Sequence, residues 1–292
     1  MSDIRPPKRV FPRAREEAET ASHQTPVPQT ADPAYRLAFQ DMDFLLREDL
    51  RPVRFQLELL KPELLLDEAK IRSTFVFYGS ARIPEPAKAD ALIAAASTDE
   101  LRRIAQSLKE KSRFYEEARR LARIASRTPR DDTGCRQFVV CSGGGPSIME
   151  AANRGACDEG AESVGLNIVL PHEQLPNPYV TPGLSFQFHY FALRKMHFLL
   201  RARAVAIFPG GFGTFDESFE LLTLIQTRKI KPLPIVFFGK EFWQRVVGFE
   251  ALVEEGVIAP RDLELFHFVD TAEEAWEHVR KWWSDREKDA DG

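Results

Sequence analysis

The residues with the clearest chemical potential form one run, Pro209-Gly-Gly-Phe-Gly-Thr-Phe-Asp-Glu217, which follows the short apolar segment 204–208. That segment reads as a buried strand, and residues 218–226 have the length and apolar spacing of a helix. The run should therefore turn into a helix N-terminus, where unpaired N–H groups and the helix dipole favour an anion. Because glycine has no Cβ, a phosphate can approach the backbone closely. We predict a phosphate site formed by Gly210, Gly211, Gly213 and Thr214. The alternative is a tight connection without a ligand.

Glu217, at the end of this run, has two interpretations. A carboxylate beside a sugar anomeric carbon could stabilise an oxocarbenium-like transition state or orient a water molecule. Alternatively, Thr214 and Glu217 have the spacing of a T-x-x-E capping box, in which the carboxylate would bond back to the N-cap amide. Spacing alone leaves both interpretations open.

A basic segment upstream supplies further candidates. The guanidinium of Arg194 could clamp a phosphate or hold a reacting carboxylate, although the residue type alone favours an ordinary surface arginine. Lys195 and His197 are weaker candidates in the same expected helix. His172 and His189 are expected to be loop or half-buried residues.

A second glycine-rich turn, Ser142-Gly-Gly-Gly-Pro-Ser-Ile-Met-Glu150, follows the expected strand 137–141. The first expected strand, 73–80, ends in Gly79-Ser80. Ligands of open parallel sheets bind at the carboxyl ends of the strands, so two such turns predict a nucleotide between them. Neither turn matches G-x-G-x-x-G, and G-x-x-x-x-G-K-[ST] is absent from the sequence.

Composition narrows the class of protein. The 292 residues carry a net charge of −4, which gives no basic excess for nucleic acid. We expect no membrane span and no secretory signal, because no apolar run is long enough. Three cysteines without C-x-x-C spacing disfavour a disulfide framework or a zinc site, and a cytoplasmic protein without a metal is expected.

The chain divides into three predicted regions. Residues 1–34 are proline-rich and expected to be a disordered tail, and residues 35–71 a helical extension. Residues 72–286 alternate strand and helix patterns, which predicts an α/β domain with a mainly parallel, doubly wound sheet and helices on both faces. Within it we expect one long, charged helix at 99–127, with a solvated face, and another helix at 240–254.

Taken together, the Arg194-Lys195 pair, Pro209-Gly-Gly-Phe-Gly-Thr-Phe-Asp-Glu217 and the turn at 142–150 resemble the Lonely Guy (LOG) family, whose hallmark is PGGxGTxxE after an Arg-Lys pair. The resemblance covers about residues 73–283. The variant Gly-Gly-Gly-Pro-Ser-Ile-Met-Glu in the turn at 142–150 looks closer to the longer bacterial members than to the short plant type. The resemblance implies a Rossmann-like fold and a homo-oligomer.

The resemblance also implies an activity, the hydrolysis of a nucleoside 5′-monophosphate, of the AMP or cytokinin-riboside type, to free base and ribose 5-phosphate. Arg194 and Glu217 would then be the catalytic pair, and the turn at 210–214 would hold the phosphate. The rest of the nucleotide site would comprise Gly143, Gly144, Gly145, Ser80, Glu150 and Lys195.

Two other functions compete with this one. Chains of this type are often labelled lysine decarboxylases, but a pyridoxal phosphate (PLP) enzyme needs a Schiff-base lysine and a partner for the pyridine ring. The sequence places only Lys195 near the expected site, in no recognisable PLP context, so we expect no cofactor. The remaining alternative is a non-catalytic carrier of a nucleotide or of the molybdenum cofactor.

Overall fold

The computed structural model describes residues 11–171 and 175–290, and the chain separates into two units, residues 1–57 and 58–292. The described part of the first unit contains short helices without a buried residue. They are α1 (Ala14–Ser22), α2 (Pro28–Ala31), η1 (Pro33–Tyr35), η2 (Ala38–Gln40), α3 (Met42–Leu45) and η3 (Glu48–Leu50).

The structure differs from the predicted disordered tail, residues 1–34, in the part of that segment that it describes. Helix α1 occupies part of it, and the N–H of Arg13 donates to the Glu16 carboxylate at 3.0 Å, which closes its first turn. Residues 1–10 of the predicted tail lie outside the described residues.

The boundary between the units also differs from the predicted one. It falls between residues 57 and 58, inside α4 (Arg51–Glu68), rather than between 71 and 72. Leu66 and Ile71 are buried, at 4% and 1% exposure. Residues 58–71 therefore belong to the sheet domain because their apolar side chains complete its core.

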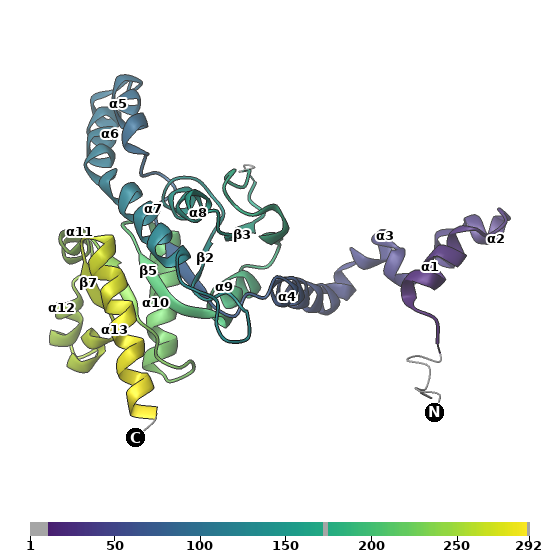
Figure 1. The fold of residues 1–292 in the computed structure, drawn as a ribbon. Coiled ribbons are helices and arrows are strands. Elements are labelled where there is room, and N and C mark those ends of the chain that lie inside the picture. The colour runs from purple at the N-terminus through teal and green to yellow at the C-terminus, as the bar shows by residue number, and fades with distance from the viewer. Residues whose placement is uncertain (1–10, 172–174, 291–292) are drawn as a thin grey trace. The chain divides into compact units, whose positions relative to one another are not determined.

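The second unit is built on one sheet in which all strands run parallel, in the order β4-β3-β2-β1-β5-β6-β7. The chain winds outward from β1 in both directions, so the predicted doubly wound, Rossmann-like α/β fold is confirmed (Figure 1). The strands are β1 (Thr74–Tyr78), β2 (Val139–Ser142), β3 (Val164–Ile168), β4 (Ser185–Phe188), β5 (Ala202–Ile207), β6 (Ile235–Phe238) and β7 (His267–Val269).

Both faces of the sheet are covered because successive strand side chains point to opposite faces. Phe75 and Phe77 belong to a core shared with α7 (Arg113–Ser126), α8 (Ile148–Asp158) and α13 (Ala272–Ala290). On the other face, the ring of Tyr78 packs edge-on against Phe198 of α9 (Phe191–Leu200), with centroids 5.1 Å apart. The remaining helices are α5 (Pro86–Ala94), α6 (Asp99–Lys111), α10 (Phe212–Gln226), α11 (Lys240–Val246) and α12 (Phe249–Glu254), with 3-10 turns η4 (Pro182–Leu184) and η5 (Pro260–Leu265).

Two of the predictions of a single helix are wrong, because each segment forms two helices. The one expected at 99–127 is interrupted at Ser112, whose hydroxyl donates to the carbonyl of Lys109 at 2.7 Å and competes with the helical pattern. The one expected at 240–254 divides into α11 and α12, because Val247 is extended and Gly248 caps the next helix. Within the described residues, no helix has the length and hydropathy that crossing a membrane requires.

Candidate functional site

The turn after β5 lies where the winding direction of the sheet reverses. The strands β1 and β5 are neighbours, and the N–H of Ser80 donates to the carbonyl of Pro209 at 3.1 Å, so the ends of these strands are held together. Helix α10 begins immediately after this turn, beside β5 (Figure 1). Ligands of doubly wound sheets bind at this position.

Helix α10 starts earlier than predicted, and this decides between the two interpretations of Glu217. Its N-cap is Gly211, and no side chain caps it. Thr214 and Glu217 therefore both lie inside the helix, and Glu217 is its sixth residue. The capping-box interpretation is wrong. Thr214 is 5% exposed, and its carbonyl accepts a hydrogen bond from the hydroxyl of Ser218 at 2.5 Å.

The three glycines of this turn are not equivalent. A Cβ on Gly210 would collide with the side chain of Thr214, so this position is sterically restricted to glycine. A Cβ on Gly211 or Gly213 would meet no atom within 4 Å. The backbone at these two positions is open, as the approach of an anion requires.

Glu217 instead faces α9, where it pairs with Arg194. The Nη1 atom of Arg194 donates to Oε1 of Glu217 at 3.1 Å, and the two side chains are 11% and 14% exposed. The Nε atom of Arg194 donates to the carbonyl of Leu166 at 2.6 Å, and its guanidinium lies 4.9 Å from the ring centroid of Phe198. These contacts leave the guanidinium little freedom, so the carboxylate beside it is positioned as well.

Burial changes the acid strength of Glu217. Removal from water raises its pKa from 4.5 to about 7, against the opposing effect of the Arg194 charge. Burial and the same carboxylate also raise the pKa of Tyr78 at the end of β1. A carboxyl group with a pKa near neutrality is suited to proton transfer or to stabilising a positive centre at physiological pH.

The glycine turn at 142–150 is held by a polar network that the sequence did not indicate. Gly144 has φ +71°, and a Cβ there would collide with the side chain of Asn167. The N–H of Gly144 donates to the hydroxyl of Ser142 at 3.0 Å, and Asn177 donates to the carbonyls of Gly144 and Gly145 at 2.8 and 3.0 Å. The N–H group of Gly144 is therefore already hydrogen-bonded within the protein. Asn177 stands in a Pro-Asn-Pro segment, which is the one signal that could have marked it.

The structure brings part of the predicted site together. A Cβ on Gly143 would lie 2.7 Å from Nη2 of Arg194, so the turn at 142–150 reaches the Arg194–Glu217 pair. The carboxylate of Glu150 instead accepts a hydrogen bond from the hydroxyl of Tyr115 at 2.9 Å.

The other basic candidates have partners of their own. The ammonium of Lys195 lies between Asp216 and Glu220 of α10, at 3.0 and 2.9 Å. The Nε2 atom of His197 lies 3.1 Å from the carbonyl of Glu58, and burial lowers the pKa of this histidine. His189 contributes its backbone N–H to the Glu58 carboxylate, and His172 lies outside the described residues.

A cavity of about 630 Å³ opens beside the glycine turn that follows β5, with Ser80, Gly210 and Gly211 in its wall. The wall also contains Arg103 and Lys111 of α6, and Arg82 after β1. The charges of this helix were expected to form a solvated face, but two of them border the candidate anion site. Sequence spacing could not show this, because the approach of α6 to the turn is a tertiary contact.

The residues do not fit PLP. Asp216 and Glu220 outweigh the effect of burial and raise the pKa of Lys195, whereas a lysine that carries PLP must lose its proton. In the described ranges, no group of three or more His, Cys, Asp or Glu side chains is placed to hold a metal ion.

Comparison with known proteins finds similarity over the part of the chain that contains this site. A family model described as possible lysine decarboxylase matches residues 149–279. The pyrimidine/purine nucleotide 5′-monophosphate nucleosidases of Escherichia coli strains K12 and O157:H7 are 30% identical over 117 residues, covering 36% of this chain and 25% of theirs. The chain thus matches about a quarter of the length of these curated relatives.

Two solved structures are also similar. The X-ray structure of TM1055, a structural genomics target, has a TM-score of 0.42 and 20% identity, covering 72% of this chain and 99% of that one. The Moco carrier protein from Chlamydomonas reinhardtii has a TM-score of 0.41 and 16% identity, covering 73% and 99%. The family match includes Arg194, Glu217 and the turn between them, so the resemblance to the LOG family that these residues indicated is confirmed over residues 149–279.

Proposed function

We propose that this protein hydrolyses the N-glycosidic bond of a nucleoside 5′-monophosphate, of the AMP or cytokinin-riboside type, to free base and ribose 5-phosphate. The observation that carries the proposal is the buried pair of Arg194 on α9 and Glu217 on α10, the helix whose N-terminus is the open glycine turn. The E. coli relatives named above are nucleotide 5′-monophosphate nucleosidases, which is in keeping with this reaction.

The phosphate provides the binding energy in this proposal. It is held by the amides of Gly211 and Gly213 and by Gly210 and Thr214 of the same turn. Lys111 and Arg103, in the wall of the adjoining cavity, contribute positive charge. Binding at a distance from the reacting bond positions the sugar, so a nucleoside without phosphate is a poor substrate.

Glu217 then acts at the anomeric carbon. As the bond between C1′ and the base nitrogen breaks, its electron pair goes to the base and positive charge develops on the sugar. The ionised carboxylate stabilises that charge and orients the water whose oxygen bonds to C1′, while a proton from this water ends on the base. Arg194 keeps Glu217 in position and favours its ionised form.

The remaining predicted contacts belong to the same proposal. Gly143, Gly144 and Gly145 form the opposite wall of the nucleotide site, and Ser80 lies beside Gly210 and Gly211 in the wall of the cavity. Glu150 and Lys195 act from the periphery through their own partners. We also propose a homo-oligomer, since α9 exposes Phe191, Met196 and Leu200 by 43–55%. Light scattering of the purified protein tests this.

The test of the reaction is direct. The purified protein is incubated with AMP, cytokinin-riboside monophosphates and other nucleoside monophosphates, and free base and ribose 5-phosphate are measured beside adenosine. Release from at least one monophosphate but not from its nucleoside supports the proposal. Tight binding without release of base supports the carrier alternative, and equal turnover of AMP and adenosine contradicts the role of the phosphate turn.

A further inference from the structure

A second hollow, of about 1140 Å³, lies between the end of α7 and residues 273–284 of α13. We call it the α7–α13 groove, and its wall includes Phe138, Trp276, Trp283, Arg203, Arg280 and Lys281. Phe138 directly precedes β2 and Arg203 is the second residue of β5. The groove therefore lies at the amino ends of the strands, at the opposite edge of the sheet from both glycine turns.

Aromatic rings form the floor of the groove. Trp276 packs on Phe75 and edge-on against Phe138, with ring centroids 6.4 and 5.4 Å apart. The indole N–H of Trp283 donates to the carbonyl of Arg203 at 3.0 Å. All three lining rings are only partly buried, and packing from behind fixes their orientation.

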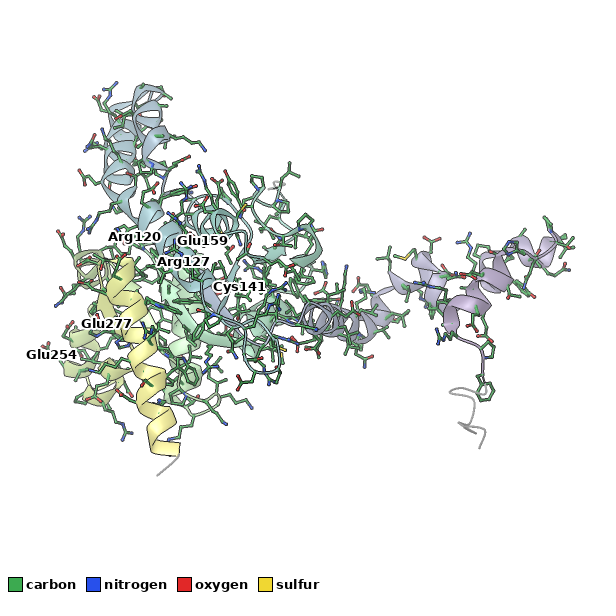
Figure 2. The ribbon with its side chains drawn as sticks, in the orientation of Figure 1. Arg120, Arg127, Cys141, Glu159, Glu254 and Glu277 are labelled. Atoms are coloured by element: carbon green, nitrogen blue, oxygen red, sulfur yellow. The ribbon has the colours of Figure 1, made fainter. Side chains whose placement is uncertain are left out.

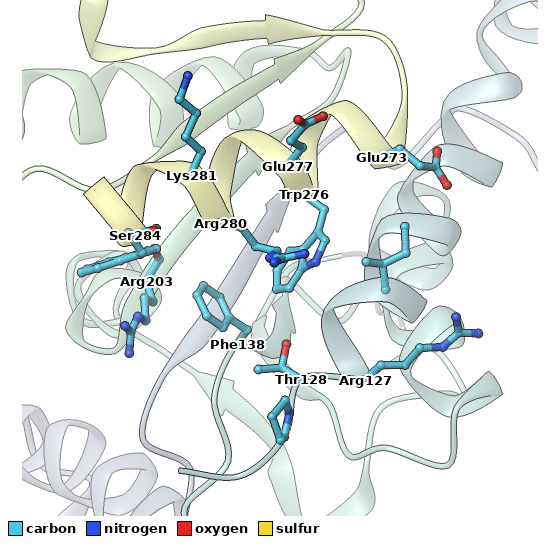
Figure 3. Close-up of a pocket in the computed structure, with 13 residues that line it drawn as sticks. Arg127, Thr128, Phe138, Arg203, Glu273, Trp276, Glu277, Arg280, Lys281 and Ser284 are labelled. Atoms are coloured by element: carbon cyan, nitrogen blue, oxygen red, sulfur yellow. The ribbon is translucent and has the colours of Figure 1, made fainter. Parts of the chain in front are cut away.

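Phe138 has an unusual backbone. Its φ is +51°, a conformation that costs a residue with a bulky side chain about 1–3 kcal/mol. The hydroxyl of Ser73 accepts its N–H at 3.0 Å and helps to hold it there. Figure 3 shows the Phe138 ring and the side chains of Trp276 and Arg280 pointing toward one another below α13.

Cations surround these rings. The guanidinium of Arg203 lies 4.3 Å from the ring centroid of Trp283, and Arg280 and Lys281 are exposed on α13. The two lining carboxylates, Glu273 and Glu277, are outnumbered by four basic residues, and Glu273 pairs with Arg120 at 2.6 Å.

The fourth basic residue of the groove, Arg127, is neutralised by Glu159 at 2.9 Å, and Figure 2 shows this pair beside α7. The hydroxyl oxygen of Thr128 is buried in the same wall without a hydrogen-bond partner among the described residues. The groove thus combines flat rings, an excess of positive charge and a buried hydroxyl.

We infer that the α7–α13 groove is a second nucleotide site, which takes a nucleobase against Phe138 and Trp276 and polyphosphate against Arg280 and Lys281. Stacking on aromatic side chains accepts any base, and arginine recognises phosphate oxygens in pairs. The volume is enough for a nucleotide. This site is independent of the proposed hydrolysis, because it shares none of the residues at the carboxyl ends of the strands.

The test uses ATP as the probe and hydrogen exchange as the local readout, because a nucleotide at the glycine turns would not protect α13. ATP should slow amide exchange in residues 276–284 of the full chain, with adenosine and tripolyphosphate each at least about tenfold weaker, or about 1.4 kcal/mol. The double variant R280E/K281E should weaken this protection by ATP at least about tenfold. Its control, K229E/K231E, reverses two exposed charges outside the groove and should protect like the wild type.

Three results would overturn the inference. They are no protection of residues 276–284 by ATP, unchanged protection in R280E/K281E, and protection by tripolyphosphate equal to that by ATP. Because the substituted residues are exposed, a folding failure is not expected, and circular dichroism of both double variants confirms this before exchange is measured.

Discussion

Helices α9 and α10 carry the two members of the Arg194–Glu217 pair, but their N-termini are used differently. At α9, the carboxylate of Glu58 accepts the N–H of His189 at 2.8 Å and the N–H of Tyr190, the N-cap, at 3.1 Å. At α10, Gly211 is the N-cap and no side chain among the described residues caps it. Both N-termini attract an anion for the same electrostatic reason. The protein supplies the anion at α9, and we propose that the substrate supplies it at α10.

The comparison explains how Arg194 is positioned. Glu58 fixes the start of α9, and at its end Arg201 pairs with Glu63 at 3.0 Å and Asp67 at 2.8 Å. Both contacts come from the part of α4 that belongs to the sheet domain. The helix that carries Arg194 is thus fastened at both ends, whereas the start of α10 is left open.

The largest effect is expected where the two helices meet. Glu217→Gln should lower kcat roughly 10²–10⁴-fold, because the neutral amide cannot stabilise positive charge on the sugar. Release of base from AMP measures this. The control is Glu220→Gln. Glu220 lies on the same helix and pairs with Lys195, and its variant should release base at a rate close to that of the wild type. Equal losses in both variants would mean that packing of α10, and not the carboxylate at 217, sets the rate.

The raised pKa of Glu217 predicts how stability depends on pH. The folded state binds the proton more tightly than the unfolded chain, so this contribution to stability is present below about pH 4.5 and is lost as pH rises through about 7. At about 1.4 kcal/mol per pKa unit, the change approaches about 3 kcal/mol. Urea unfolding from pH 4.5 to 8.5 should show wild type losing stability relative to Glu217→Gln, with a plateau above 7. A difference independent of pH would contradict the buried state of this group.

The same group predicts the pH dependence of activity. If ionised Glu217 acts at the anomeric carbon, kcat/KM should rise up to pH near 7 and then level off. Arg194→Lys keeps a positive charge without the planar contact to Glu217, so the rise should move to higher pH. A profile that falls through this range would assign Glu217 the role of an acid.

The open N-terminus of α10 can be blocked without disturbing the fold. Gly211→Ala places a methyl group where no atom lies within 4 Å, so stability should hold while KM for the monophosphate rises about tenfold. Gly183→Ala, also in open space, is the matched control. Thermal unfolding measures the stability and steady-state kinetics the KM. An unchanged KM would mean that the phosphate does not bind at this turn.

The smallest effect is expected at the occupied N-terminus. Glu58→Gln keeps one acceptor but loses the charge, so α9 should be destabilised by about 1 kcal/mol and kcat should fall several-fold through Arg194. The onset of activity with pH should move as well, which a purely structural loss would not cause. Glu68→Gln, exposed on the same helix α4, is the control. An unchanged pH profile would mean that Glu58 does not influence the Arg194–Glu217 pair.

Much of the fold could be predicted because its signals are local. Apolar runs before glycine turns indicated β2 and β5, and the alternation of strands with helices indicated the doubly wound parallel sheet. Helix ends were less predictable. The start of α10 at Phe212 was missed because glycines at 211 and 213 are poor helix formers, and here the turn geometry outweighs that propensity.

By itself, the sequence determined which chemistry is available: a glycine turn at a helix N-terminus, with a carboxylate and an arginine nearby in the family motif. Only the tertiary structure decided that Glu217 faces Arg194 at 3.1 Å instead of its own backbone, and that burial raises its pKa to about 7. It also decided that Glu58 holds the start of α9 and that Arg103 and Lys111 of α6 line the cavity beside the turn. Contacts and desolvation arise between segments far apart in the chain, and no local pattern of residues encodes them.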